Sequence, residues 1–172
     1  MTTESFITTI PNNTSFLQTT RYTFIIPNLP FAKYFCQSIN LPGVSSSEIE
    51  VSTPFSSTYR HPSKLSYDSF SISFLVDEDL KVWEETYKWI VSLTRPESFS
   101  QYIKYNDRNA SPYQDGMLTV NTNANIPNIR IKFRNVFPVS LSGIQFGTTN
   151  SADTTPTADL TFRYDLFEFE RL

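Results

Sequence analysis

Glycine is scarce in this chain of 172 residues, which contains only four of them. Gly43, Gly116, Gly143 and Gly147 are spaced neither as GxGxxG nor as GxxxxGKS/T. The glycine-rich loops that hold nucleotide phosphates are therefore excluded. Turns must depend instead on the eleven prolines and on Asn, Asp and Ser residues.

Residues that commonly carry catalysis or bind metals are almost as scarce. His61 is the only histidine, which rules out multi-histidine metal sites and most Ser-His-Asp arrangements. Cys36 is the only cysteine; it cannot form an internal disulfide, and we expect a small buried hydrophobe in an apolar strand. The acidic run from Asp77 to Asp79 is typical of a helix start rather than of paired catalytic carboxylates. We therefore expect no enzymatic activity, no cofactor and no metal.

Long apolar runs and an excess of positive charge are also missing. The sequence has no apolar run of about 18 residues or more, so no membrane-spanning helix is expected. Its first residues lack the basic and apolar regions of a signal peptide. The net charge of −3 and the pI near 5.1 argue against a chain that grips nucleic acid by its phosphates.

Aromatic residues, in contrast, are abundant at 15% of the chain, and together with Val and Ile they favour strands. The length suits one domain. We predict an extended polar arm over residues 1–20 and a single, mainly β domain over residues 21–172. Alternating apolar residues and turn signals predict strands at 21–26, 31–39, 48–52, 70–76, 117–120, 128–136, 141–146 and 158–169, with a short helix near 98–104.

The clearest local pattern is an amphipathic helix over residues 77–93, with Asp77 as its N-cap. Glu84 and Lys88 have the i, i+4 spacing of an exposed ion pair. Trp89 lies off the apolar stripe, so we expect it at an interface or beneath a loop. The stripe itself is predicted to pack on the sheet, and it consists of Leu80, Trp83, Tyr87, Ile90, Val91 and Thr94.

The segment Pro54–Asp68 is the first candidate for contacts with other molecules. It is long for a plain connection, and we predict a long hairpin or a protruding loop. Aromatic and arginine side chains often anchor interfaces, although a solvated loop is the simpler alternative. The candidate interface residues in this segment are Phe55, Tyr59, Arg60, His61 and Lys64.

The strand at 128–136 supplies a second candidate surface. Its apolar residues alternate with a basic row formed by Arg130, Lys132 and Arg134. Such a row can bind phosphates, face solvent or face a partner. Because the chain is acidic overall, we favour ion pairs between subunits over nucleic-acid binding.

Three stretches of the chain follow one another in a recognisable order. Residues 36–43 form a strand that ends in Leu-Pro and a small residue. In residues 68–90 an alternating strand leads into an acidic helix start and an aromatic-rich helix. Residues 129–146 contain a late strand, an aromatic-Pro turn and a further strand, and residues 160–169 close the chain. This order resembles the tail tube proteins of contractile-tailed bacteriophages of the T-even type, themselves structurally akin to the tube protein of type VI secretion.

The resemblance implies an antiparallel β-sandwich or barrel-like tube-protein fold with a flanking α-helix. It implies a structural subunit of hexameric rings, which stack into a channel for genome delivery inside a contractile sheath. The implied partners are further copies of the chain, sheath proteins and baseplate proteins, with DNA passing through the lumen without specific binding and with no membrane. The implied location is the virion tail, assembled in the host cytoplasm.

Two departures from that family leave alternatives open. The N-terminal arm is longer than usual, and the segment after Lys64 lacks an expected glycine. A specialised tube-like protein of the baseplate or tail terminus is therefore one alternative. A non-enzymatic β-sandwich binding module of the virion is another.

Overall fold

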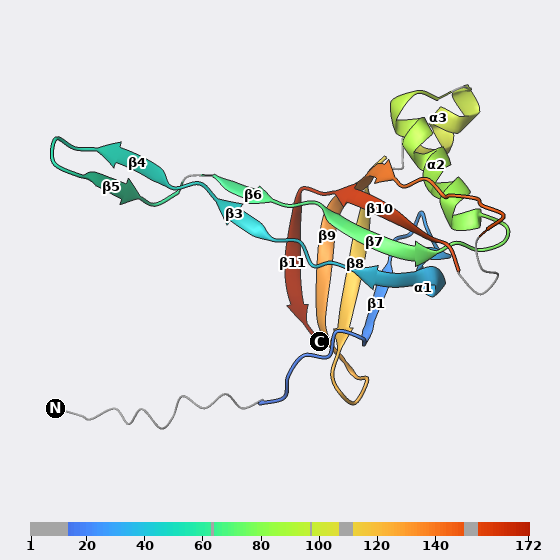
Figure 1. Cartoon of the computed structure of the whole chain (residues 1–172), viewed down its shortest axis with the longest axis horizontal. Helices are drawn as coiled ribbons and strands as arrows, with labels where there is room; N and C mark the ends of the chain where they lie inside the picture. Colours follow the sequence, from blue (N-terminus) through green and yellow to red (C-terminus); the bar gives the residue numbers. More distant parts are fainter. Residues whose placement is uncertain (1–13, 63, 97, 107–111, 150–154) are drawn as a thin grey trace.

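The computed structural model describes residues 14–62, 64–96, 98–106, 112–149 and 155–172. The strands of its main sheet are antiparallel and lie in the order β1-β8-β9-β10-β7-β2, with β11 paired to β9 as well (Figure 1). These strands are β1 (Tyr22–Ile25), β2 (Cys36–Ile39), β7 (Phe70–Leu75), β8 (Gln114–Asn121), β9 (Pro127–Leu141), β10 (Thr157–Arg163) and β11 (Leu166–Arg171).

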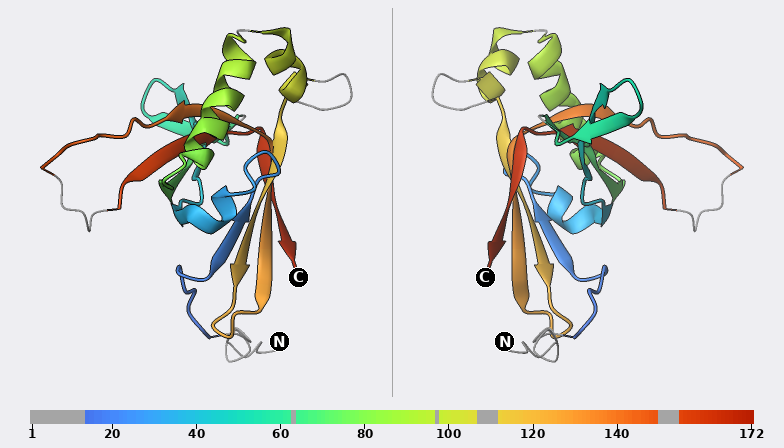
Figure 2. Two further views of the ribbon diagram at one scale, coloured as in Figure 1. Left: turned by 90° about the vertical axis from the view of Figure 1, so that its right-hand side faces the viewer. Right: turned by 90° about the vertical axis from the view of Figure 1, so that its left-hand side faces the viewer.

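The long strand β9 belongs to two layers of the fold. Its first part pairs with β8 on one side and with β11 on the other, and its last residues pair with β10. We call β1, β8, the first part of β9 and β11 the first layer, and the end of β9, β10, β7 and β2 the second layer. Figure 2 shows α2 and α3 together at one end of the sheets. The sheet thus turns back on itself and can enclose a core between its layers.

A β-bulge allows β9 to leave the first layer. Arg134 and Asn135 together lie opposite one residue of β8, Asp115, because Gln114 pairs with Val136 while Gly116 pairs with Phe133. Asn135 has a positive φ of 55°, which Asn tolerates better than most residues. The extra residue shifts the in–out alternation by one position, so Phe133 and Val136 are both buried.

The carboxylate of Asp115 holds this bulge. It accepts hydrogen bonds from the Asn135 backbone N–H at 3.2 Å and from the Arg134 guanidinium at 2.8 Å. The Asn135 side-chain amide donates to Asp165 in the turn between β10 and β11, at 2.5 Å. Side chains from three segments therefore fix the place where β9 changes layers.

Aromatic side chains fill the space between the layers. Phe70 on β7 lies at the centre, with ring centroids 4.7 Å from Phe133, 5.0 Å from Phe162 and 5.9 Å from Phe24. The apolar positions of β7 alternate with Ser71 and Ser73 as predicted. Burying such side chains removes apolar surface from water and joins the two layers into one core.

The main helix, α2 (Lys81–Thr94), confirms one prediction and contradicts two. The predicted pair of Glu84 and Lys88 forms, with 2.5 Å between Oε1 and Nζ. The helix begins at Lys81 and not at residue 78, because Leu80 has a positive φ of 54°. Asp77 still contributes to its start by accepting a hydrogen bond from the Lys81 N–H at 3.2 Å.

The predicted apolar stripe of α2 is only partly correct, because Trp83 packs against the core while the fully buried residues belong to a different face of the helix. The buried face consists of Val82, Thr86, Trp89 and Ser92, whereas Tyr87 of the predicted stripe is 49% exposed. The hydroxyls of Thr86 and Ser92 donate to carbonyls of their own helix, so these polar residues can be buried at little cost. Trp89 is fully buried beneath the segment that precedes β8, where its indole N–H donates to the carbonyl of Pro112 at 3.4 Å.

Four further segments can be compared with the sequence-based expectation. The predicted strand 31–39 begins with a short helix, α1 (Ala32–Phe35), and only its end forms β2. Residues 142–146 are not a strand, because β9 runs through to Leu141 without interruption. The expected short helix is confirmed as α3 (Phe99–Asn106). Of the predicted N-terminal arm, residues 1–13 lie outside the described residues and residues 14–20 are exposed.

A hairpin arm projects from the body of the molecule (Figure 1). It contains two successive two-stranded ribbons, β3 with β6 and β4 with β5. The hairpin foreseen as one possibility for the segment 54–68 is therefore confirmed, and the arm begins earlier than that segment. The ribbons are formed by β3 (Val44–Ser46), β4 (Ile49–Ser52), β5 (Ser57–Arg60) and β6 (Leu65–Tyr67).

Of the two tryptophans of α2, replacing the buried Trp89 should destabilise the protein more. Trp89→Ala is expected to lower the free energy of unfolding by about 3–5 kcal/mol, because it removes a fully buried aromatic ring. Trp83→Ala is the matched control and should cost less, since Trp83 is only half-buried. Urea denaturation of both variants measures the difference, and an equal or larger loss at Trp83 would contradict the observed burial.

The bulge makes a separate prediction for Asn135. Asn135→Ala and Asn135→Gly both lose the hydrogen bond to Asp165, but only alanine places an unsupported Cβ in the left-handed region. We expect the alanine variant to be less stable than the glycine variant by about 1 kcal/mol. Equilibrium denaturation distinguishes the two, and equal stabilities would show that this backbone conformation is not required.

Candidate assembly interface

The arm is anchored to the body at its root. The ring of Tyr67, the last residue of β6, lies 5.9 Å from the ring of Tyr164 and 5.6 Å from that of Phe167. The Asp68 N–H donates to the Gly43 carbonyl at 3.1 Å, and Arg163 donates to the Tyr67 carbonyl at 3.2 Å. The strands of the arm therefore leave the body together, from between the second layer and β11.

Beyond its root the arm exposes nearly all of its side chains. Phe55, at the tip, is completely exposed, and Tyr59 is 63% exposed. An isolated two-stranded ribbon is at best marginally stable in water. Exposed apolar residues that the sequence analysis did not single out add to this surface, and they are Val44, Ile49 and Leu65.

The five interface candidates predicted in this segment all lie on the arm. Phe55 is in the turn between β4 and β5, where the Thr53 N–H donates to the Ser56 carbonyl at 2.9 Å. Tyr59 and Arg60 are on β5, and the remaining two, His61 and Lys64, lie between β5 and β6. All five are exposed.

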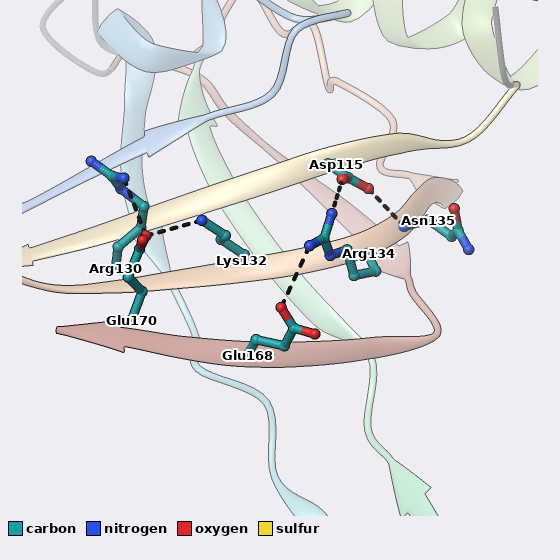
Figure 3. A network of polar contacts seen from close by, with 7 residues as sticks. All are labelled: Asp115, Arg130, Lys132, Arg134, Asn135, Glu168 and Glu170. Carbon is teal, nitrogen blue, oxygen red and sulfur yellow. Dashed lines mark hydrogen bonds and ion pairs between the residues drawn. The ribbon is translucent and has the colours of Figure 1, made fainter.

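The predicted basic row on β9 forms a charged strip with acidic residues of its own chain. The strip consists of Asp115, Arg130, Lys132, Arg134, Glu168 and Glu170, and it lies on the first layer's face away from the core (Figure 3). Its side chains are between 33% and 55% exposed. The arm and the strip are separate surfaces, carried by different strands.

Every cation of the strip has a carboxylate partner. Arg130 and Lys132 both approach Glu170, at 3.2 Å and 3.0 Å. Arg134 lies between Asp115 at 2.8 Å and Glu168 at 3.5 Å (Figure 3). Ion pairs between subunits, which the sequence analysis favoured for this row, remain a prediction, but each cation already has a partner within one copy.

The pKa values in the strip reflect these pairs. The hydrogen bond from Lys132, with the nearby Arg130 charge, holds the pKa of Glu170 below its ordinary value. The hydrogen bond to Asp115 raises the pKa of Arg134 further. Sequence reasoning missed the acidic partners, although Glu168 and Glu170 have the same two-residue spacing as the cations opposite them.

The outer strands of the sheet leave edges without a strand partner in the described part of the chain. In the first layer these are the outer edges of β1 and β11. In the second layer the edge of β2 faces β1 across a groove of about 580 Å³. Unpaired edges tend to join the strands of other chains.

The groove between β1 and β2 shows no sign of reactive chemistry. The hydroxyl of Tyr22 lies 4.0 Å from the sulfur of Cys36, which is half-buried at the start of β2. Burial raises the pKa of Tyr22 to about 12 and raises that of Cys36. Both groups therefore stay protonated at neutral pH, and a protonated thiol is a poor nucleophile.

The residues that the structure describes contain neither a metal-binding cluster nor a membrane-spanning helix. No group of three or more His, Cys, Asp or Glu residues there is arranged to hold a metal ion. No helix in that part of the chain has the length and apolar character needed to cross a membrane.

Comparison with known proteins agrees with this geometry. The family model described as phage tail tube protein matches residues 4–170. No curated protein matches the sequence.

Solved structures show the same fold over nearly the whole chain. A chain of the anti-feeding prophage cap, which terminates that tube, has a TM-score of 0.67 at 16% identity and covers 98% of this chain and 100% of its own. A chain of the anti-feeding prophage baseplate, 6-fold symmetrised, has a TM-score of 0.61 at 12% identity, with coverages of 92% and 97%. A chain of the PVC sheath-tube complex, from an extracellular contractile injection system, has a TM-score of 0.60 at 14% identity, with coverages of 100% and 99%. At such identities these likenesses establish the fold alone, and they confirm the predicted tube-protein fold.

Proposed function

The chain belongs to the phage tail tube protein family, and from this premise we propose that it is a structural subunit of a tail tube. Copies form hexameric rings, and the rings stack into a channel for genome delivery. The observation that carries the proposal is the family match over residues 4–170. Its mechanism follows from the open strand edges, the polar face and the arm.

The open edges of the first layer suit the closure of a ring. Successive strands in this layer are antiparallel, so β1 and β11 run in opposite directions at its two sides. Placing β11 of one copy beside β1 of the next continues that alternation around a ring. Such a contact joins two different surfaces, and it closes when the rotation between neighbours divides a full turn. Ring closure also removes the exposed edges that would favour uncontrolled association.

The two faces of the first layer differ in a way that suits a channel. Its apolar face is covered by the second layer, through side chains such as Phe133 and Phe162. Its other face carries the charged strip and remains open to water. An antiparallel sheet with one packed face and one solvated face can line an aqueous lumen. We therefore place the charged strip on the channel side.

The arm suits contacts between stacked rings. It extends well away from the body (Figure 1) and exposes Phe55, Tyr59 and Arg60, which contribute little to the core of a single copy. Burying these side chains against another copy would remove apolar surface from water and support the thin ribbons. The remaining partners we propose are sheath and baseplate proteins, in a virion tail assembled in the host cytoplasm.

A second candidate function is a specialised tube-like subunit that ends the tube or joins it to the baseplate. The specific observation in its favour is the match of almost the entire chain to the cap of the anti-feeding prophage. Such a subunit would form rings but would not extend them into long tubes. The number of rings in the assembled particle separates this candidate from the main tube subunit.

Electron microscopy of the purified protein tests the proposed function. Negative-stain images over a range of concentrations should show rings or stacked tubes, with sixfold symmetry in end views, as in the 6-fold symmetrised baseplate that contains a similar chain. Single rings without stacks would favour the terminal subunit. Compact monomers at every concentration would contradict both candidates and favour a binding module.

The arm makes its own prediction. The triple variant Phe55→Ser, Tyr59→Ser and Arg60→Ser should melt like the parent protein, because these side chains are exposed. Its tubes should be lost or shortened, because the stacking contact is gone.

The control removes exposed aromatic rings elsewhere, in the variant Phe99→Ser with Tyr102→Ser on α3. It should form tubes of normal length. Normal tubes from the folded arm variant would disprove the role of the arm, and a large fall in its melting temperature would show that the arm belongs to the core.

A further inference from the structure

The basic row on β9 has the geometry of a phosphate-binding surface. Arg130, Lys132 and Arg134 point from one face of one strand, and alternate residues of a strand lie about 6.6 Å apart. Lysine and arginine in such a row neutralise phosphates and release the counterions bound to them, which drives binding to nucleic acid without regard to sequence. Nothing in the spacing of these cations would prevent such binding.

The carboxylates around the row counteract this tendency. Glu170 contacts two cations, and Glu168 and Asp115 share the third. Three positive and three negative side chains make the strip neutral overall. A phosphate approaching the row would have to displace a carboxylate from each cation and would also be repelled by the displaced charge.

These ion pairs contribute too little to the stability of the sheet to explain their presence. Each side chain in the strip is at least one-third exposed, and exposed ion pairs contribute little to folding. The pairing of β9 with β11 is already maintained by backbone hydrogen bonds over residues 129–134 and by the buried ring of Phe133. The acids therefore alter the surface of the first layer more than its stability.

We propose that Glu168 and Glu170 keep the polar face of the first layer from binding nucleic-acid phosphates by occupying the cations of β9. This inference rests on the proposed function, because it matters most if the face lines a channel. There the row would recur in every copy of every ring. Even weak binding to each copy would then add up through multivalency and hold the passing genome.

The direct test is the double variant Glu168→Gln with Glu170→Gln, assayed for binding to a short labelled DNA duplex. Asp115 is left in place because it also holds the bulge at Asn135. The parent should show no binding in the micromolar range at physiological salt. The variant should bind at least about tenfold more tightly, and log K should fall with log salt at a slope of about −2, as expected for two freed cations.

Two matched variants separate masking from a simple change in net charge. Asp79→Asn with Glu84→Gln also removes two negative charges, raising the net charge from −3 to −1, and takes one carboxylate contact from each of two lysines on α2. It should bind no better than the parent, because those lysines do not form a row on the sheet. Adding Arg130→Gln and Lys132→Gln to the first variant should abolish the gained binding.

Thermal melting shows whether each variant is folded, and electron microscopy shows whether the parent protein assembles. A folded Glu168→Gln, Glu170→Gln variant that binds no better than the parent overturns the inference, as does an equal gain in the α2 control. If the double variant unfolds, the two single variants replace it. Glu170→Gln should then gain more DNA affinity than Glu168→Gln, because Glu170 contacts two cations. Parent protein that forms no rings or tubes contradicts the proposed function and leaves the masking measurement interpretable, since the duplex assay uses the subunit itself.

Discussion

The passage of β9 from one layer to the other depends on one extra residue, and the rest of the molecule depends on that passage. At Asn135 the in–out alternation of the strand shifts by one residue, so that Phe133 before the bulge and Val136 after it both face the core. Asp115 stabilises this bulge through the Asn135 N–H and the Arg134 side chain. Because β9 takes part in both layers, its uninterrupted backbone connects the two sheets that enclose the core around Phe70.

The same passage determines which surfaces remain available to other molecules. The first layer keeps one polar face, since only its other face is covered by the second layer. Its outer strands, β1 and β11, keep open edges within the described part of the chain. The turn that begins β11 is tied to Asn135 through Asp165, so the edge proposed to close the ring is fixed by the bulge itself. Folding and assembly thus depend on the same few polar contacts.

The sequence correctly predicted the elements whose residue pattern alone determines their structure. Strand β7 was predicted correctly because its apolar residues alternate strictly, and the arm because its segment is too long for a plain connection. The buried face of α2 was predicted wrongly, because Thr86 and Ser92 look polar in sequence but satisfy their hydroxyls within the helix. The basic row of β9 was visible in the sequence, but its acidic partners depend on strand register, which is not local. The family resemblance supplied the assembly hypothesis, and no short motif did.

The central claim is that the first layer lines a closed channel, with β11 of each copy beside β1 of the next. A cryo-EM reconstruction of the assembled particle measures this directly. The account predicts a continuous antiparallel sheet around the axis, with Arg130, Lys132 and Glu170 facing the lumen. A reconstruction in which the charged strip faces outward, or in which β1 and β11 of neighbouring copies do not meet, would contradict it.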